Sequence, residues 1–138
     1  MSINQIQDEI IEEFSAFDDW MDRYSLLIEY GNGLEPMEES DKTDQNLIDG
    51  CQSKVWFTAE LQDGKVIYHG DSDAILVKGI VALLIRVLSN QTPADITGAE
   101  LYFIEDIQLK EHLSPTRSNG LVAMLNQMRL FALTYAKL

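Results

Sequence analysis

Cysteine, proline and positive charge are scarce in this sequence. Its 138 residues include one cysteine, three prolines and 10 Lys or Arg, against 23 Asp or Glu. A single cysteine, Cys51, cannot form an internal disulfide or supply a multi-thiolate metal site. The formal net charge of −13 repels a phosphate backbone, so we expect a basic protein surface rather than nucleic acid as a partner.

A targeting segment and a long apolar run are also missing. Residues 1–5 carry neither the basic nor the apolar region of a signal peptide. The longest apolar run, residues 74–88, is interrupted by Lys78 and Arg86, which makes it a poor membrane span. Because a free thiol persists in a reducing compartment, these features together predict a cytoplasmic protein with no membrane partner.

The sequence does contain enough apolar residues for a globular core. Hydrophobic residues make up 46% of the chain, and its length fits a single domain over residues 1–138. Glycine and acidic residues mark the expected helix ends: Gly31 should end the second helix, and residues 71–73 should cap the third. Apolar residues with helical spacing predict helices that begin at Ser2 and at Asp18 or Asp19, a central helix over 73–89, a helical turn after Thr92, and a last helix from Ser114.

A β-hairpin is predicted in the middle of the chain. Residues 55–61 alternate between apolar and polar side chains, which is typical of a strand. Asp63-Gly64 favours a tight turn, and residues 66–69 return as the partner strand, which Gly70 should end. Helices at both ends of the chain and a small antiparallel sheet between them predict the α+β class.

Two segments are harder to assign. Residues 33–46 are polar and strongly acidic and show no apolar face, so we expect a long surface loop. Residues 99–113 fit either a third strand or a short helix. The first of these segments leads directly to the only cysteine.

Cys51 is the strongest candidate for chemistry. A lone cysteine is most often a buried and unreactive core residue. Here Gly50 precedes it and the polar residues Gln52 and Ser53 follow, so the pattern indicates a loop, where core packing explains a thiol less well. A loop thiol can protrude and attack, provided that a cation or backbone donors lower its pKa from about 8.5.

His69 and His112, the only histidines, leave two alternatives open. Either could pair with Cys51 as in a cysteine hydrolase, and both could join Cys51 and a carboxylate around zinc. The spacing gives little support to either arrangement. His69 falls in a strand pattern and His112 precedes an apolar leucine, so structural roles are the more frequent explanation.

Arg117 is the candidate positive group. It lies in the first turn of the last predicted helix, where the helix dipole opposes a cation. The ordinary interpretation is a surface ion pair, and the functional one is a cation that stabilises a thiolate, a persulfide or an acidic partner. Gly120 in the same helix costs about 1 kcal/mol relative to alanine, which close packing would explain.

Three motifs together resemble those of the SufE family. They are GCQSKVW at 50–56, GDSDAILVKGIVALL at 70–84 and HLSPTRSNGL at 112–121. The resemblance extends over essentially the whole chain, and the paralogue CsdE shares the pattern. It implies an α+β fold with a small antiparallel sheet packed against helices, similar to that of the scaffold IscU. Cluster-scaffold activity would need several cysteine ligands, so one cysteine argues against it.

SufE proteins accept sulfur from cysteine desulfurases, so the resemblance implies a sulfur carrier that works through a persulfide on Cys51. The donor would be a SufS- or CsdA-type desulfurase, which uses pyridoxal phosphate, and the receiver a scaffold complex that contains SufB. The chain itself would hold no cofactor and no metal and would not be a stand-alone enzyme, while a homodimer stays open. The candidate supporting residues are Arg117, Gln52 and Ser53, and the candidate docking residues are Asp71 and Asp73.

Two other functions stay open beside sulfur transfer. A docking module would regulate the desulfurase without carrying sulfur, and a redox sensor would form a sulfenic acid on Cys51. The carrier needs the sulfur atom of Cys51, whereas the docking module does not.

Overall fold

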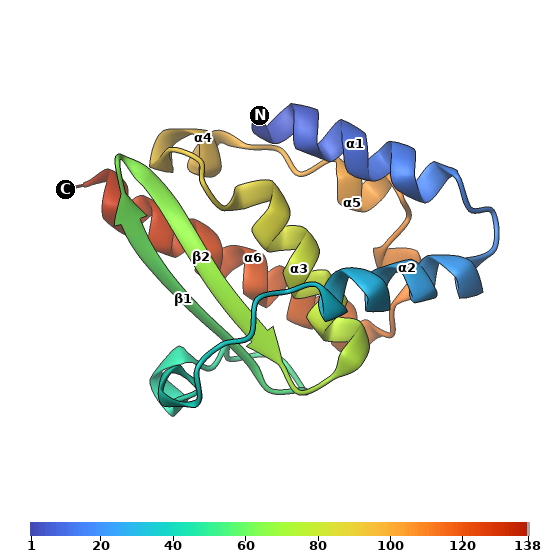
Figure 1. Cartoon of the computed structure of the whole chain (residues 1–138), viewed down its shortest axis with the longest axis horizontal. Helices are drawn as coiled ribbons and strands as arrows, with labels where there is room; N and C mark the ends of the chain where they lie inside the picture. The colour runs from blue at the N-terminus through green and yellow to red at the C-terminus, as the bar shows by residue number, and fades with distance from the viewer. Residues whose placement is uncertain (138) are drawn as a thin grey trace.

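The computed structural model describes residues 1–137, so Leu138, the last residue of the predicted domain, lies outside the described part. In this part, helices pack beside one two-stranded antiparallel sheet, which confirms the α+β class (Figure 1). The helices are α1 (Ile3–Ser15), α2 (Trp20–Asn32), α3 (Ile75–Leu88), α4 (Pro93–Gly98), α5 (Phe103–Asp106) and α6 (Pro115–Ala136). The strands are β1 (Val55–Gln62) and β2 (Lys65–Ser72), and short 3-10 turns are η1 (Glu39–Asp41), η2 (Asp44–Asn46) and η3 (Lys110–His112).

The helix starts follow local sequence signals. The Ser2 hydroxyl accepts a hydrogen bond from the Gln5 N–H at 3.1 Å, and the Gln5 side chain accepts one from the Ser2 N–H at 2.9 Å. This capping box begins α1. Asp19 caps α2 and Ser114 caps α6 through their own side chains, which confirms the predicted starts.

The hairpin forms as expected but is longer than predicted. Its turn places Asp63 and Gly64 at φ angles of 52° and 79°, the left-handed pair that a two-residue hairpin turn requires. Gly70 does not end β2, which continues to Ser72. Gly70 instead allows close packing, because an added Cβ would lie 2.9 Å from Cγ1 of Val81 on α3.

Helix α3 runs through the middle of the molecule, with the hairpin on one side and α2 on the other (Figure 1). The crossing of α2 and α3 is close because glycines face each other. A Cβ on Gly79 would lie 2.2 Å from the Leu27 carbonyl oxygen, and one on Gly31 would lie 2.9 Å from the Gly79 nitrogen. The prediction that Gly31 ends α2 is therefore wrong, and the helix continues to Asn32.

The start of α3 differs from the prediction as well. The helix begins at Ile75 after Ala74, and no side chain caps it. Asp71 instead accepts a hydrogen bond from the Ser72 N–H at 2.8 Å, and Asp73 accepts one from the Lys54 N–H at 3.0 Å. Neither acidic side chain caps α3, and Asp73 instead bonds the residue that precedes β1.

The two ambiguous segments are short and partly helical. Residues 33–46 contain η1 and η2, and Met37 is buried, so the segment is attached to the core more firmly than an open loop would be. Residues 99–113 form α5 and η3, and no third strand occurs in the described residues. Phe103 and Ile107 are buried there, which confirms that this segment contributes apolar residues to the core.

Helix α6, the longest helix of the described residues, packs against the hairpin. The Tyr68 hydroxyl on β2 donates to the Met128 carbonyl at 2.6 Å, and the Tyr135 hydroxyl on α6 donates to the Ala59 carbonyl at 2.8 Å. These bonds fix α6 against both strands. Within residues 1–137, no helix has both the length and the apolar character needed to cross a membrane.

Candidate functional site

Cys51 lies on a short loop whose two ends are held by backbone hydrogen bonds. The Ile48 N–H donates to the Val55 carbonyl at 2.9 Å. Lys54 and Asp73 form a second tie, through hydrogen bonds from the Lys54 N–H to the Asp73 carboxylate and from the Asp73 N–H to the Lys54 carbonyl. The loop between these ties lies next to β1, where the turn signal at Gly50 predicted it.

Gly50 gives the loop its sharp direction. Its φ angle is 91°, in the left-handed region where side chains other than glycine are strained. The chain turns there and brings Cys51 down onto α6. Cys51 is half-buried as a result, and its thiol donates a hydrogen bond to the Gly120 carbonyl at an Sγ–O distance of 3.6 Å.

The surroundings of the thiol favour its neutral form. Burial raises the pKa of Cys51 above its ordinary value, because a thiolate loses water there. The Gly120 carbonyl acts in the same direction, since it accepts a proton that only the thiol carries. This conformation therefore lowers the thiolate fraction of Cys51 at a given pH.

A pocket of about 270 Å³ opens beside the thiol. Loop residues form one wall, α3 contributes apolar side chains, and the first turns of α6 contribute polar ones. The pocket is thus apolar toward the core and polar toward the surface. Its lining residues include Cys51, Gln52, Ser53, Val77, Ile80, Ser114, Thr116, Arg117, Gly120 and Met124.

The structure brings Arg117, Gln52 and Ser53 together with Cys51 around this pocket. Arg117 is exposed and lies at the N-terminal end of α6, where its backbone N–H donates to the Ser114 hydroxyl at 3.2 Å. From this position its guanidinium group can meet an anion that enters the pocket or a partner that covers it. The supporting roles of these three residues stay predictions.

The two candidate docking residues occupy different environments. Asp71 is 4% exposed, and its carboxylate lies 3.4 Å from the amino groups of both Lys42 and Lys78. Asp73 is exposed at the base of the Cys51 loop. Docking by Asp73 therefore stays a prediction, whereas the position of Asp71 in this conformation indicates a structural ion pair.

The histidines do not accompany Cys51 at this pocket. His69 on β2 lies 3.2 Å from the Glu60 carboxylate, and the ring of His112 stacks on Trp20 at a centroid distance of 3.8 Å. These contacts explain both histidines without catalysis. Among residues 1–137, no three His, Cys, Asp or Glu side chains gather in a way that could hold a metal ion.

Several pocket residues were not expected to be functional from the sequence. Val77 and Ile80 carry the signal of a core helix and nothing more, and Met124 belongs to an ordinary apolar stripe. Gly120 is different, because a glycine inside a helix does call for a packing reason. That signal pointed to close packing in α6, and the structure shows that Cys51 is the group packed against it.

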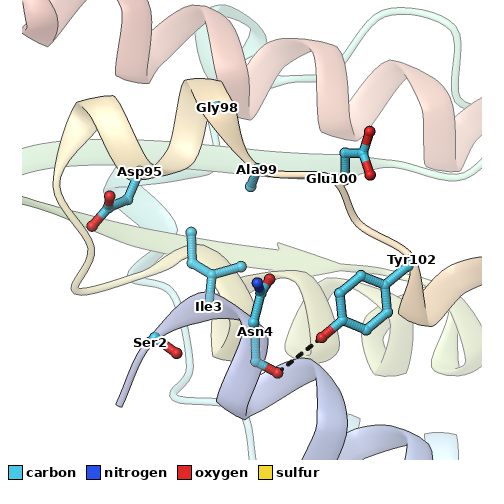
Figure 2. A pocket seen from close by; sticks show the side chains of 8 residues that line it. All are labelled: Ser2, Ile3, Asn4, Asp95, Gly98, Ala99, Glu100 and Tyr102. Atoms are coloured by element: carbon cyan, nitrogen blue, oxygen red, sulfur yellow. Dashed lines mark hydrogen bonds between the residues drawn. The ribbon is translucent and has the colours of Figure 1, made fainter.

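A larger hollow of about 530 Å³ lies elsewhere, between the first turn of α1 and the segment that follows α4 (Figure 2). The Tyr102 hydroxyl lies at one end of it, 3.1 Å from the Asn4 carbonyl oxygen and 2.7 Å from the Asp8 carboxylate. Asp95 and Glu100 are exposed at its edge, and none of the residues that line it is a cysteine or histidine. The Cys51 pocket therefore remains the candidate site.

Comparison with known proteins identifies the family of the chain. The family model described as "SufE: Fe-S metabolism associated domain" matches residues 8–132. The chain belongs to the SufE family. It is also 45% identical over 127 residues to an uncharacterized SufE-like protein of Synechocystis sp., covering 92% of this chain and 80% of that protein. Membership in the SufE family places the protein in iron–sulfur metabolism.

The fold of this SufE family member also matches a solved structure. The solution structure of a hypothetical protein from Thermus thermophilus superimposes with a TM-score of 0.79. The match covers 96% of this chain and 97% of that one at 21% sequence identity. At this identity the likeness concerns the fold alone.

Proposed function

We propose that the protein accepts sulfur from a cysteine desulfurase as a persulfide on Cys51 and delivers it to an iron–sulfur cluster scaffold. The observation that carries this proposal is a single thiol on a short, tied loop beside a pocket that Arg117 lines. Family membership supports the link to iron–sulfur metabolism. The donor would be of the SufS or CsdA type, and the receiver a complex that contains SufB.

The reaction is an exchange between a thiolate and a persulfide. The Cys51 thiolate attacks the outer sulfur of the donor persulfide, so that a new sulfur–sulfur bond forms on Cys51 while the donor's own sulfur–sulfur bond breaks. The donor cysteine leaves as a thiolate, and the proton of the transferred sulfur stays with it or passes to solvent. No external oxidant or reductant is needed.

The resting structure protects the acceptor before this step. Burial raises the pKa of Cys51 and its thiol donates to the Gly120 carbonyl, so movement out of this position would favour the thiolate and bring it toward a partner. Arg117 lines the same pocket, and its positive charge would stabilise the anion that then forms. A lone thiol also suits a carrier, since a second nearby cysteine would convert the persulfide to a disulfide and release sulfide.

The test is transfer of radiolabelled sulfur from cysteine through the desulfurase to the protein, followed on a non-reducing gel. Wild type should carry label that a reductant removes, and Cys51→Ser should carry none, because an alkoxide is not available near neutral pH. Ser40→Ala, an exposed substitution on η1, should behave as wild type. If Cys51→Ser stimulates sulfide release as well as wild type does, the protein is a docking module and the carrier mechanism is wrong.

A further inference from the structure

The surface of α6 beneath the Cys51 loop has two small residues one helical turn apart. A Cβ added to Gly120 would lie 3.4 Å from the Cys51 sulfur and 3.9 Å from the Cys51 Cα. A Cβ added to Gly50 would lie 3.4 Å from the Ala123 Cβ. The loop backbone therefore rests directly on the helix, with Cys51 over Gly120 and Gly50 over Ala123.

The backbone conformation at position 120 does not call for a glycine. Positive φ angles occur among the described glycines at Gly50 and Gly64, whereas Gly120 lies within α6. A glycine inside a helix costs about 1 kcal/mol relative to alanine. Outside the backbone of α6 itself, Cys51 supplies all three of the heavy atoms nearest to a Cβ at this position, at 3.4–3.9 Å. An alanine would meet Cys51 at ordinary contact distance, and a larger side chain would press on it.

The same glycine also supplies the hydrogen-bond acceptor of the thiol. Its carbonyl oxygen lies 3.6 Å from the Cys51 sulfur. A carbonyl on a helix backbone cannot move with a side chain, so the position of the sulfur is tied to the axis of α6. The missing side chain of Gly120 and its fixed carbonyl oxygen thus both bear on the position of the Cys51 sulfur.

We propose that Gly120 and Ala123 form a seat on α6 that sets how deeply the Cys51 sulfur lies and so when it can react. Gly120 is a positioning residue in this proposal, since it acts through Cys51. The role in sulfur transfer rests on the function proposed above, but the position of the thiol does not. A larger side chain in the seat lifts the loop, exposes the sulfur to water and removes its bond to the carbonyl.

The experiment measures alkylation of Cys51 by iodoacetamide across pH, on the full chain without any partner. Gly120→Val should lower the apparent pKa of Cys51, and each unit by which it falls raises the thiolate fraction at pH 7 about tenfold. Asn119→Val places the same side chain on the exposed side of the same turn and is the matched control. It should leave the alkylation profile at the wild-type value.

Two further variants keep the test decisive if Gly120→Val does not fold. Gly120→Ala adds a Cβ at 3.4 Å from the sulfur, an ordinary contact distance that leaves the loop in place, and should keep the wild-type profile. Ala123→Leu acts on Gly50 rather than on the thiol and should also speed alkylation. A wild-type profile in Ala123→Leu would overturn the seat. Because no desulfurase is present, failure of sulfur transfer in the earlier test would leave this result unaffected.

Discussion

A substitution of Asp71 tests whether this carboxylate stabilises the fold or serves as a docking residue. Its carboxylate is 4% exposed and lies 3.4 Å from the amino groups of Lys42 and Lys78. Lys42 belongs to the acidic segment that leads to Cys51, and Lys78 belongs to α3. The carboxylate therefore holds three parts of the chain together at the end of β2.

The informative change is Asp71→Asn, which keeps the size and the acceptor for the Ser72 N–H but removes the charge. An exposed ion pair contributes about 0–1 kcal/mol, whereas a hydrogen bond to a charged group contributes about 1.5–3 kcal/mol. The side chains of Lys42 and Lys78 are 23% and 29% exposed, so each ion pair is partly shielded from water and should contribute an energy between these two cases. We expect a loss of about 1–3 kcal/mol in the free energy of unfolding, or roughly 3–5 °C in Tm per kcal/mol.

The loss should depend on pH with a defined sign. Burial opposes ionisation of Asp71, but the Ser72 N–H bond, Lys78 and Lys42 outweigh it, so the pKa of this carboxyl lies below its usual value of 3.8. The folded state then binds fewer protons than the unfolded state. The stabilisation is complete above about pH 4 and disappears as the pH falls through the folded pKa, so the two proteins should converge in acid.

Urea unfolding at a series of pH values between about 3 and 7 measures this difference. Asp73→Asn is the matched control, since Asp73 is exposed and its amide would still accept the Lys54 N–H. The control should keep the wild-type midpoint. Equal midpoints for Asp71→Asn and wild type at neutral pH would refute the structural role, and binding of each folded variant to the desulfurase would then show which carboxylate serves docking.

Two further predictions concern the Cys51 loop. Arg117→Ala should slow sulfur uptake at Cys51 and cost at most about 1 kcal/mol in stability, while Arg117→Lys should restore part of the rate, because lysine lacks the planar donor fork. An unchanged transfer rate in the alanine variant would make Arg117 a surface residue without a role. Amide hydrogens of residues 49–53 should exchange faster in the complex with the desulfurase than in the free protein, and slower exchange would argue against a loop that leaves its seat.

Local signals in the sequence were sufficient for most of the secondary structure. The capping box at Ser2, the turn at Asp63-Gly64 and the Ser114-Pro115 start of α6 each depend on residues within a few positions of one another. The candidate reactive residue could also be named from the sequence, because Cys51 is the only cysteine and follows a turn-forming glycine. Such features need no knowledge of what the rest of the chain does.

The tertiary structure decided what several of these residues contact. The sequence predicts that Gly31 ends α2, yet the helix continues past it to Asn32. Gly31 instead packs against Gly79, which is far along the chain. The sequence predicts that Asp71 lies at a helix start, yet its carboxylate forms ion pairs with lysines from two other segments. A glycine or an aspartate has the same local preferences in either setting, so only the long-range contact distinguishes them.

At the candidate site, too, local sequence signals and long-range contacts decided different features. The sequence by itself determined that one thiol would stand on a loop before β1, and that α6 would begin with Ser114, Pro115 and Arg117. Only the folded chain brings Cys51 to Gly120, 69 positions away, and thereby decides that the resting thiol is half-buried, neutral and bonded to a backbone carbonyl. The physical reason is that burial and hydrogen bonding depend on which surfaces meet, and residues that are distant in the sequence supply those surfaces.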